Sequence, residues 1–283
     1  MTGLRRIAED WLERAEAAVL VEVTQARGSA PRDAGTRMLV SRDRAEGTIG
    51  GGHLELKAIE QARRMLAERS PGPQSAHYPL GPALGQCCGG AVTLGFESLA
   101  AAHLERWPRP RPRFHLQLYG AGHVGRAIAR LLATLDCEVD WIDEREEEFP
   151  DSLGSLDSLG TLGSLGNGRW PAHVRRIAVD AVEAEVDDAP PGAFYLVLTH
   201  QHDLDLRITE AILKRGDFGY LGLIGSKTKR QRFFRHFERR GIAAESIARV
   251  TCPIGVPGIE GKEPEVIAIA VLAQLLQQPI SDG

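Results

Sequence analysis

The sequence has little of several features that define specialised classes of protein. Only 6% of its 283 residues are aromatic, and only four are cysteine. No apolar run approaches the ~18 residues that a membrane-spanning helix needs, so we expect no membrane partner. Four cysteines are too few for a disulfide scaffold, which favours a reducing, cytoplasmic environment. The net charge of −4 is slightly acidic, so we expect no nucleic-acid partner either.

Glycine is the residue in surplus, with 31 of the 283 positions. The glycines do not recur at every third position, so the sequence is not collagen-like. The apolar share of 43% is ample for a buried core and excludes a disordered chain. Most of the glycines gather in short loops beside predicted helices, which favours close approach of the backbone to a ligand.

A segment with proline at alternate positions, 107–113, divides the sequence and predicts an extended linker. Before it, residues 1–106 predict a smaller α/β (α+β) domain that begins with an amphipathic helix rather than a signal peptide. After it, residues 114–283 alternate predicted strands and helices, which is typical of a Rossmann-like parallel sheet. A Ser/Thr-Leu-Gly tandem at 152–168 predicts a flexible insert without chemistry.

The C-terminal domain contains one G-x-G-x-x-G motif at residues 120–125, between a predicted strand and a predicted helix. Gly120 suits the tight turn, and Gly122 lets the backbone approach a pyrophosphate. Gly125 allows close packing of the helix on the strand, and His123 lies within the loop. The helix N-terminus attracts phosphate, so the motif predicts a dinucleotide site.

Asp143 ends the next predicted strand, about twenty residues after the glycine loop. Its carboxylate is expected to accept hydrogen bonds from a ribose, as in NAD-binding domains. Arg145 and the insert lie close by in the sequence. A Rossmann-like fold that binds nothing at this loop therefore stays open as the alternative.

Two further loops follow buried strands of the same predicted sheet. One contains His200 and His202, which are candidates for ligand contact. With Asp203 or Asp205 they could hold a metal, but no third protein ligand is close in sequence. A hydrogen-bonded loop with a helix N-cap at Asp203 or Asp205 is favoured over a metal site. The other contains Ser226 and Lys227 at the start of a basic helix, where cations oppose the helix dipole unless an anion joins them. A solvated basic face explains that helix equally well.

Two loops of the N-terminal domain also suit anions. Three consecutive glycines, Gly50, Gly51 and Gly52, precede a predicted helix, and their amide groups form a nest of donors. Arg32 ends a short Gly-Ser-Ala-Pro-Arg turn and adds a guanidinium group, which suits phosphate. Taken alone, each loop is more often only a turn.

The most unusual feature is the run Gln86-Cys87-Cys88 with glycines on both sides. Adjacent cysteines rarely form an unstrained disulfide, and the absence of C-x-x-C disfavours a thioredoxin-type site. Small neighbours leave the thiols exposed, and a thiolate is a metal ligand and a sulfur nucleophile. Cys137 and Cys252 lie in apolar runs instead, where a buried thiol is expected.

Taken together and in this order, seven motifs closely resemble the XdhC/CoxI family of bacterial xanthine dehydrogenase accessory proteins. They are Gly28-Ser-Ala-Pro-Arg32, Gly47-Thr-Ile-Gly-Gly-Gly52, Gly85-Gln-Cys-Cys-Gly-Gly90, Gly120-Ala-Gly-His-Val-Gly125, Thr199-His-Gln-His202, Ile224-Gly-Ser-Lys227 and Pro253-Ile-Gly-Val-Pro-Gly258. The resemblance covers nearly the whole chain. The insert at 152–168 departs from the family pattern.

The resemblance implies a chaperone for the molybdenum cofactor rather than an enzyme. Such a protein holds the molybdopterin cofactor while a cysteine desulfurase supplies its sulfido ligand. It then delivers the cofactor to the molybdenum subunit of xanthine dehydrogenase. By that resemblance Cys87 or Cys88, beside Gln86, contacts molybdenum, which sulfur ligands suit. Arg32 and the loop 50–52 are then candidates for the pterin phosphate.

Other assignments remain open at this point. The Rossmann-like domain is expected to hold NAD or the nucleotide part of an extended cofactor. An NAD-dependent oxidoreductase is the alternative function, with His200 or His202 as the general acid or base. A nucleotide-sensing regulator is less favoured, because no DNA-binding element is evident. A homodimer is compatible with the sequence, although no motif requires one.

Overall fold

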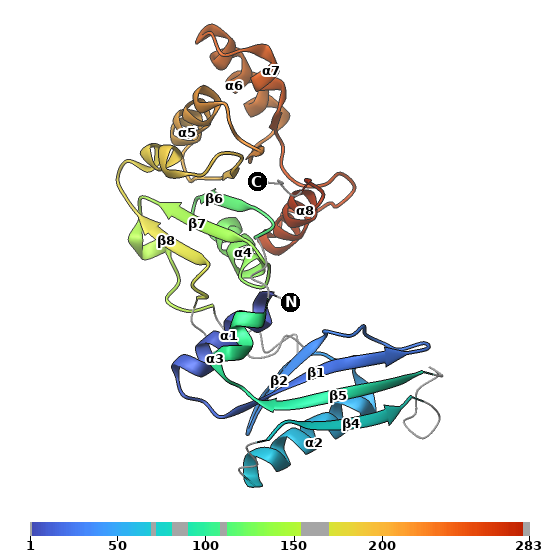
Figure 1. Cartoon of the computed structure of the whole chain (residues 1–283). Coiled ribbons are helices and arrows are strands. Elements are labelled where there is room, and N and C mark those ends of the chain that lie inside the picture. Colours follow the sequence, from blue (N-terminus) through green and yellow to red (C-terminus); the bar gives the residue numbers. More distant parts are fainter. Residues whose placement is uncertain (1, 69–71, 81–89, 108–111, 154–169, 280–283) are drawn as a thin grey trace. The chain divides into compact units, whose positions relative to one another are not determined.

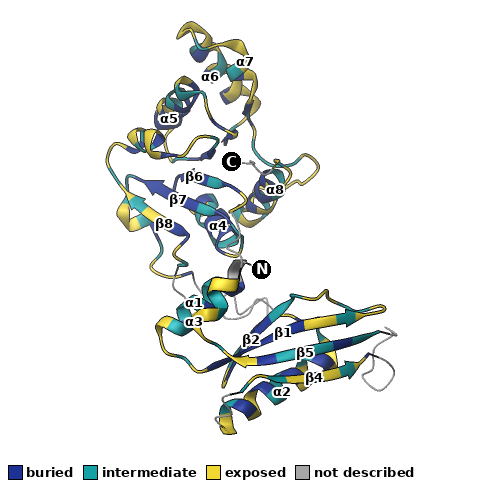
Figure 2. Cartoon of the chain, viewed as in Figure 1, coloured by how far each residue is buried: buried dark blue, intermediate teal, exposed yellow. Residues whose placement is uncertain are grey.

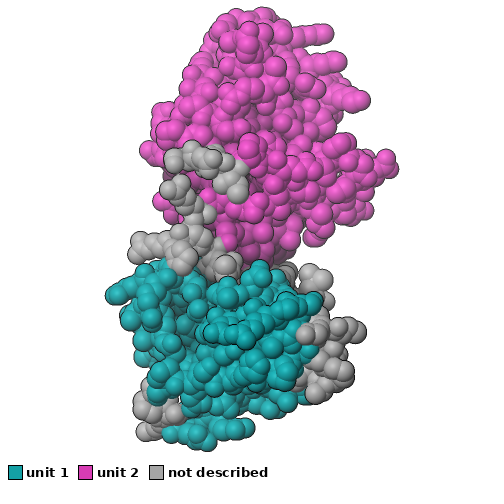
Figure 3. All heavy atoms as spheres, turned by 45° about the vertical axis from the view of Figure 1, so that its right-hand side comes forward, with its two compact units in different colours: residues 1–110 teal, residues 111–283 magenta. Residues whose placement is uncertain are grey.

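The computed structural model describes residues 2–68, 72–80, 90–107, 112–153 and 170–279. The chain divides into two compact units, residues 1–110 and residues 111–283, which Figure 3 shows in different colours. The division falls inside the Pro/Arg segment. Each unit is described by itself below, as the N-terminal unit and the C-terminal unit. Within the described ranges, no helix is both long and apolar enough to cross a bilayer.

The N-terminal unit is built on a five-stranded sheet with the order β3-β2-β1-β5-β4, in which every neighbouring pair is antiparallel (Figure 1). Its strands are β1 (Ala18–Arg27), β2 (Arg37–Ser41), β3 (Ala45–Gly47), β4 (Gln74–Pro79) and β5 (Ala91–Ser98), and its helices are α1 (Thr2–Glu13), α2 (Gly52–Glu68) and α3 (Ala101–Arg106).

Alternation along the strands sends side chains to two different cores. Val19 and Val21 of β1 face α2 and pack against its buried Leu54. Leu20, between them, points to the opposite face and joins a second cluster with Trp11 of α1. The period of two in a strand produces this division. As a result, α2 covers one face of the sheet, and α1 covers part of the other.

The C-terminal unit is built on a six-stranded parallel sheet with the order β11-β10-β9-β6-β7-β8. The strands are β6 (His115–Tyr119), β7 (Glu138–Asp143), β8 (Val174–Ala178), β9 (Phe194–Val197), β10 (Tyr220–Leu223) and β11 (Val250–Thr251). The α-helices are α4 (His123–Leu132), α5 (His202–Arg215), α6 (Lys227–Arg239), α7 (Ala244–Ala248) and α8 (Pro264–Leu276), and the 3-10 turns include η2 (Glu146–Glu148) and η5 (Val182–Asp188).

The central strands of this sheet are buried on both faces, as Figure 2 shows by their dark colour. Leu116 and Leu118 of β6 belong to a core with α4 and α8. Tyr195 and Val197 of β9 belong to a core on the other face, with α5 and α6. Helices on both faces of a parallel sheet define a doubly wound fold. The predicted fold class, a Rossmann-like domain after a smaller mixed domain, is confirmed.

The strand order reverses between β6 and β9. From β6 the chain builds outward through β7 and β8, and it then crosses back to add β9 on the other side of β6. Tyr119 near the end of β6 is in register with Ile142 of β7 and with Val197 of β9. In open α/β sheets, ligands bind outside the carboxyl ends of the strands at such a reversal. This edge is therefore the first candidate site.

Candidate functional site

The glycine loop predicted to bind a dinucleotide connects β6 to α4 at this reversal. Gly120 has φ +121°, and a Cβ atom on it would lie 2.4 Å from the carbonyl oxygen of Leu198 in the neighbouring loop. A Cβ atom on Gly125 would lie only 2.0 Å from the carbonyl oxygen of Gly120. Both glycines are required by close backbone contact inside the protein.

Gly122 differs from the other two glycines of the motif. It is the N-cap of α4 with φ −69°, and a Cβ atom on it would have nothing within 4 Å. The space in front of this helix N-terminus is open, and the exposed His123 begins the helix beside it. The free amide groups of a helix N-terminus suit a phosphate.

Asp143 lies at the end of β7 beside the loop, but its carboxylate faces protein groups. Oδ2 accepts a hydrogen bond of 2.6 Å from the amide of Ala121, and the guanidinium of Arg145 spans both oxygens at 3.0 Å. Burial alone would raise the pKa of this carboxyl, but the hydrogen bonds from Arg145 and Ala121 outweigh burial and lower the pKa. A ribose at Asp143 would have to displace Arg145.

The loop after β9 forms the other wall of the crevice. Asp143, Glu144, Thr199 and His200 line one small hollow at this edge, and Gly120 touches the same loop through Leu198. His200 Nε2 lies 3.4 Å from Oε1 of Glu144. The structure therefore brings His200 and the glycine loop together, whereas His202 is an exposed first residue of α5.

A buried ion pair connects the loops that follow β9 and β10. Asp205 is completely buried and accepts hydrogen bonds at 2.9 and 2.7 Å from the backbone and side chain of Thr199. Its other oxygen accepts a hydrogen bond from Lys229 of α6, whose ammonium also donates to the carbonyl of Ile224 at 2.9 Å. Lys229 thus has an internal anion, which the sequence analysis did not anticipate.

The start of α6 is capped by Ser226. Ser226 accepts a hydrogen bond of 3.2 Å from the amide of Lys229, and Lys227 is exposed as the first helical residue. No hydrogen bond or ion pair within the described ranges engages the Lys227 side chain. Ser226 and Lys227 follow β10, which is next to β9, so they stand one strand farther from the glycine loop.

The N-terminal unit has its own cluster of glycine loops. A Cβ atom on Gly50 would lie 2.5 Å from the ring of Pro31, so the turn that carries the exposed Arg32 rests on the triple-glycine loop. The nest of amide groups in that loop is already filled. Glu55 of α2 accepts hydrogen bonds from the amides of Gly51 at 2.7 Å and Ile49 at 3.1 Å.

The third glycine motif of this unit, residues 85–90, ends at Gly90, which lies in the same cluster of loops. A Cβ atom on Gly90 would lie 2.4 Å from the carbonyl oxygen of Arg27 and 2.7 Å from that of Ser29. The amide of Leu80 donates a hydrogen bond of 2.7 Å to the carbonyl of Gly90. Segment 81–89, with Gln86, Cys87 and Cys88, lies outside the described residues. The two residues that flank this segment, Leu80 and Gly90, are hydrogen-bonded to each other, and Gly90 packs against Arg27 and Ser29.

The remaining cysteines match their predicted environment, because Cys137 and Cys252 are both buried. In the parts of the chain that the structure describes, no three His, Cys, Asp or Glu side chains form a group suited to a metal ion. Sequence reasoning missed Glu55 as an organising residue, although an acidic side chain in the first turn of α2 is a recognisable capping signal.

A doubly wound sheet with a glycine loop at its reversal, preceded by an antiparallel domain with clustered glycine loops, defines a two-domain α/β protein with a Rossmann-like domain. The chain belongs to the XdhC/CoxI family. The family model of the XdhC Rossmann domain matches residues 116–275, and the model of the XdhC and CoxI family matches residues 11–78. The resemblance inferred from the seven motifs is therefore confirmed.

Two known proteins are similar to this chain over most of its length. The uncharacterized protein YqeB of Escherichia coli (strain K12) is 34% identical over 91% of this chain, which spans only 43% of that relative. A crystal structure described as a xanthine dehydrogenase from Bacillus halodurans shares the fold, with a TM-score of 0.65 at 19% identity. That similarity covers 97% of this chain and 95% of the solved one.

Proposed function

We propose that the protein is an accessory factor that holds the molybdenum cofactor for sulfuration and delivers it to xanthine dehydrogenase. Membership of the XdhC/CoxI family supports an accessory role rather than turnover. The observation that carries the proposal is the convergence of three glycine motifs at one end of the N-terminal sheet. Gly50 packs on Pro31 there, and Gly90 packs on Ser29.

The converging loops offer the chemical groups that the cargo requires. Cys87 and Cys88 belong to the segment that begins after Leu80 and ends at Gly90, and their thiolates would contact molybdenum. Arg32 is exposed beside this cluster and would pair with the pterin phosphate. Glu55 occupies the nearby amide nest, so a phosphate there would have to replace its carboxylate.

The C-terminal unit would hold a nucleotide, either NAD or the nucleotide part of an extended cofactor. The open space at Gly122 and the helix N-terminus behind it support a pyrophosphate at this position. A ribose at Asp143 requires Arg145 to move, because the guanidinium spans that carboxylate. The proposed partners are a cysteine desulfurase and the molybdenum subunit of xanthine dehydrogenase.

One observation favours a different function, that of an NAD-dependent oxidoreductase. His200 lies beside Glu144 at the carboxyl edge of the sheet, the edge at which a general acid or base would meet a bound nicotinamide. This alternative leaves the N-terminal glycine loops and the two adjacent thiols without a role. Oxidation of NADH with a panel of carbonyl substrates tests it, and sustained turnover that His200→Gln abolishes would favour the enzyme.

The main proposal is tested by purifying the protein anaerobically from a host that makes molybdenum cofactor. We expect bound molybdenum by elemental analysis and a fluorescent pterin after oxidation. The double variant Cys87→Ala/Cys88→Ala should lose the cofactor but remain folded. Cys252→Ala, which removes a buried thiol of the C-terminal unit, serves as the matched control and should retain it. Repeated preparations without metal and pterin would overturn the proposal.

A further inference from the structure

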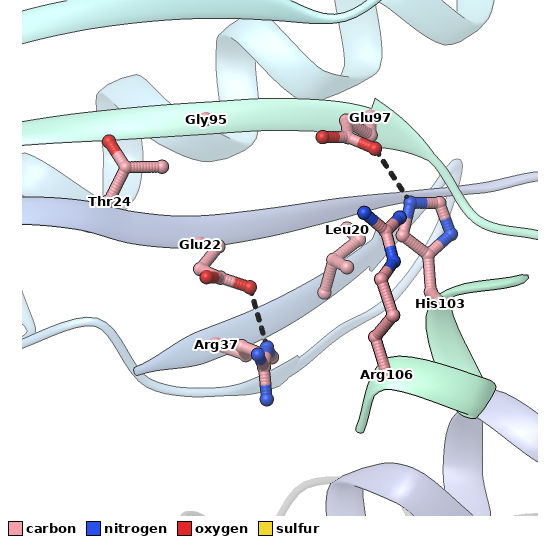
Figure 4. A pocket seen from close by; sticks show the side chains of 8 residues that line it. All are labelled: Leu20, Glu22, Thr24, Arg37, Gly95, Glu97, His103 and Arg106. Atoms are coloured by element: carbon pink, nitrogen blue, oxygen red, sulfur yellow. Dashed lines mark hydrogen bonds and ion pairs between the residues drawn. The ribbon is translucent and has the colours of Figure 1, made fainter. Parts of the chain in front are cut away.

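The outer face of the N-terminal sheet contains a polar cavity away from the glycine loops. It has a volume of about 220 Å³ and lies on the opposite face of the sheet from α2 (Figure 4). Its lining residues come from β1, β2, β5 and α3, and they are Leu20, Glu22, Thr24, Arg37, Gly95, Glu97, His103 and Arg106. Gly95 creates part of the space, because it sits opposite Glu22 in the sheet and has no side chain.

Two acid–base pairs form the walls of the cavity. Arg37 Nε donates a hydrogen bond of 2.6 Å to one oxygen of Glu22, and the Arg37 guanidinium stacks over Trp107. On the other side, His103 Nε2 lies 2.8 Å from one oxygen of Glu97. Each pair uses one carboxylate oxygen, and no hydrogen bond within the described ranges engages the other oxygen. Each glutamate therefore keeps an acceptor for a ligand.

Both ring nitrogens of His103 already have partners in the protein. Nδ1 lies 3.0 Å from the amide nitrogen of Ala100 and 3.1 Å from its carbonyl oxygen, and Nε2 faces Glu97. The imidazole therefore leaves no free polar atom for a ligand. The carboxylates and guanidinium groups that line the cavity belong to two glutamates and two arginines.

Arg106 is the arginine of the cavity that has no ion-pair partner among the described residues. Its side chain extends from α3 beside Glu97 and His103 (Figure 4). It is exposed, and it forms no ion pair or hydrogen bond with any residue that the structure describes. An arginine at the edge of a cavity with free carboxylate oxygens opposite can bind a ligand of both charges.

We propose that this cavity binds a small zwitterion of the α-amino acid class. Its ammonium group is placed between the free oxygens of Glu22 and Glu97, and its carboxylate pairs with Arg106. Leu20 contacts a short side chain. The balance of two negative and two positive groups favours a ligand with no net charge over a simple anion or cation. The volume suits a compact molecule, and the inference does not depend on the proposed cofactor function.

Isothermal titration calorimetry of the full chain tests the proposal with the proteinogenic amino acids as individual probes. We expect saturable binding of at least one amino acid with a small side chain. Acetate and methylammonium, which each present one charge, should not bind at the same concentration. N-acetylation of the bound amino acid should abolish binding, because it removes the ammonium group that the two glutamates accept.

Two variants assign the binding to this cavity. Arg106→Gln and Glu97→Gln should each weaken binding about tenfold or more, because each removes a charge-assisted contact. Arg63→Gln, which alters an exposed arginine of α2 on the other face of the sheet, should bind like the unmodified protein. The proposal is overturned if no amino acid binds, if acetate binds equally well, or if both cavity variants retain full affinity. The exposed position of Arg106 makes a folding defect in its variant unexpected.

Discussion

The ammonium group of Lys229 donates a hydrogen bond to the carboxylate of Asp205, and both residues are buried, at 9% and 0% exposure. Asp205 also receives the amide of Thr199, and Lys229 also donates to the carbonyl of Ile224. These two backbone groups belong to the loops that follow β9 and β10. One ion pair therefore fixes the relative positions of two loops at the carboxyl edge of the sheet.

Removing the cation should leave Asp205 as an uncompensated buried charge. We expect Lys229→Met to lower the free energy of unfolding by about 3–5 kcal/mol, the usual cost of breaking a buried pair from one side. Urea denaturation followed by circular dichroism measures the change. Lys227→Met is the control, because Lys227 is exposed two residues earlier. Equal stability of the two variants would show that the pair is not needed for folding.

The sequence predicted the C-terminal unit better than it predicted this ion pair. The strands β9 and β10 are short apolar runs, and strands alternate with helices along the unit, so the doubly wound sheet was foreseeable. Asp205 and Lys229 are 24 positions apart, and their contact depends on the adjacency of β9 and β10. A local sequence pattern does not indicate which strands become neighbours in the sheet. The basic start of α6 was therefore interpreted only as a ligand-anion site or a solvated basic face.

The edge strands β4 and β11 were also difficult to predict from the sequence. In β4, exposed and partly buried residues alternate, with only Ala76 and Tyr78 packed near the core. Its pairing with β5, not its composition, defines it as a strand. The two-residue β11 at the other sheet is likewise defined by its pairing with β10. Neither segment has enough apolar residues to be predicted from the sequence by itself.

Two substitutions in the glycine loop after β6 are expected to differ in their effect on stability. Gly125→Ala places a Cβ atom 2.0 Å from the carbonyl oxygen of Gly120, and the backbone must shift to accept it. We expect a loss of about 3 kcal/mol in the free energy of unfolding. Gly122→Ala meets nothing within 4 Å and should unfold like the unmodified protein.

The same two variants separate folding from binding. Gly122→Ala adds a methyl group where the proposed pyrophosphate approaches, so nucleotide affinity should fall about tenfold while stability is unchanged. Thermal unfolding with and without NAD, together with direct calorimetric titration, measures both quantities. Undiminished NAD binding by the Gly122 variant would place the nucleotide elsewhere or exclude the predicted pose.

A further prediction concerns Glu55, whose carboxylate occupies the nest of amide groups in the loop at 49–51. Glu55→Ala removes the acceptor of the amides of Ile49 and Gly51 and should cost about 1–2 kcal/mol of stability. Inorganic phosphate should restore part of the lost thermal stability, since the amide nest is then free. Glu60→Ala, an exposed position on the same helix, should show neither effect. A midpoint of the Glu55 variant that phosphate leaves unchanged would contradict the expected role of the nest.

The contact between α5 and α6 should depend on pH through Glu210. Hydrogen bonds from Lys214 at 2.7 Å, and from His236 and Arg240 at 3.1 Å, lower the pKa of Glu210 to about 2. Because the pKa is lower in the folded protein than in the unfolded chain, the unfolded chain binds more protons between the two values. The stabilisation is thus complete above the unfolded pKa, near 4.5, and is lost as the pH falls toward 2.

Glu210→Gln should therefore cost stability at neutral pH but little near pH 2. The expected loss at pH 7 is about 1–2 kcal/mol, because Lys214 and Arg240 are more than half exposed and solvent screens their charges. Urea unfolding at a series of pH values measures the difference between variant and unmodified protein. Glu245→Gln, at an exposed site on α7, should show no such pH-dependent difference. A constant difference across the series would mean that Glu210 contributes through packing rather than charge, because only a carboxylate that titrates differently in the two states can change stability with pH.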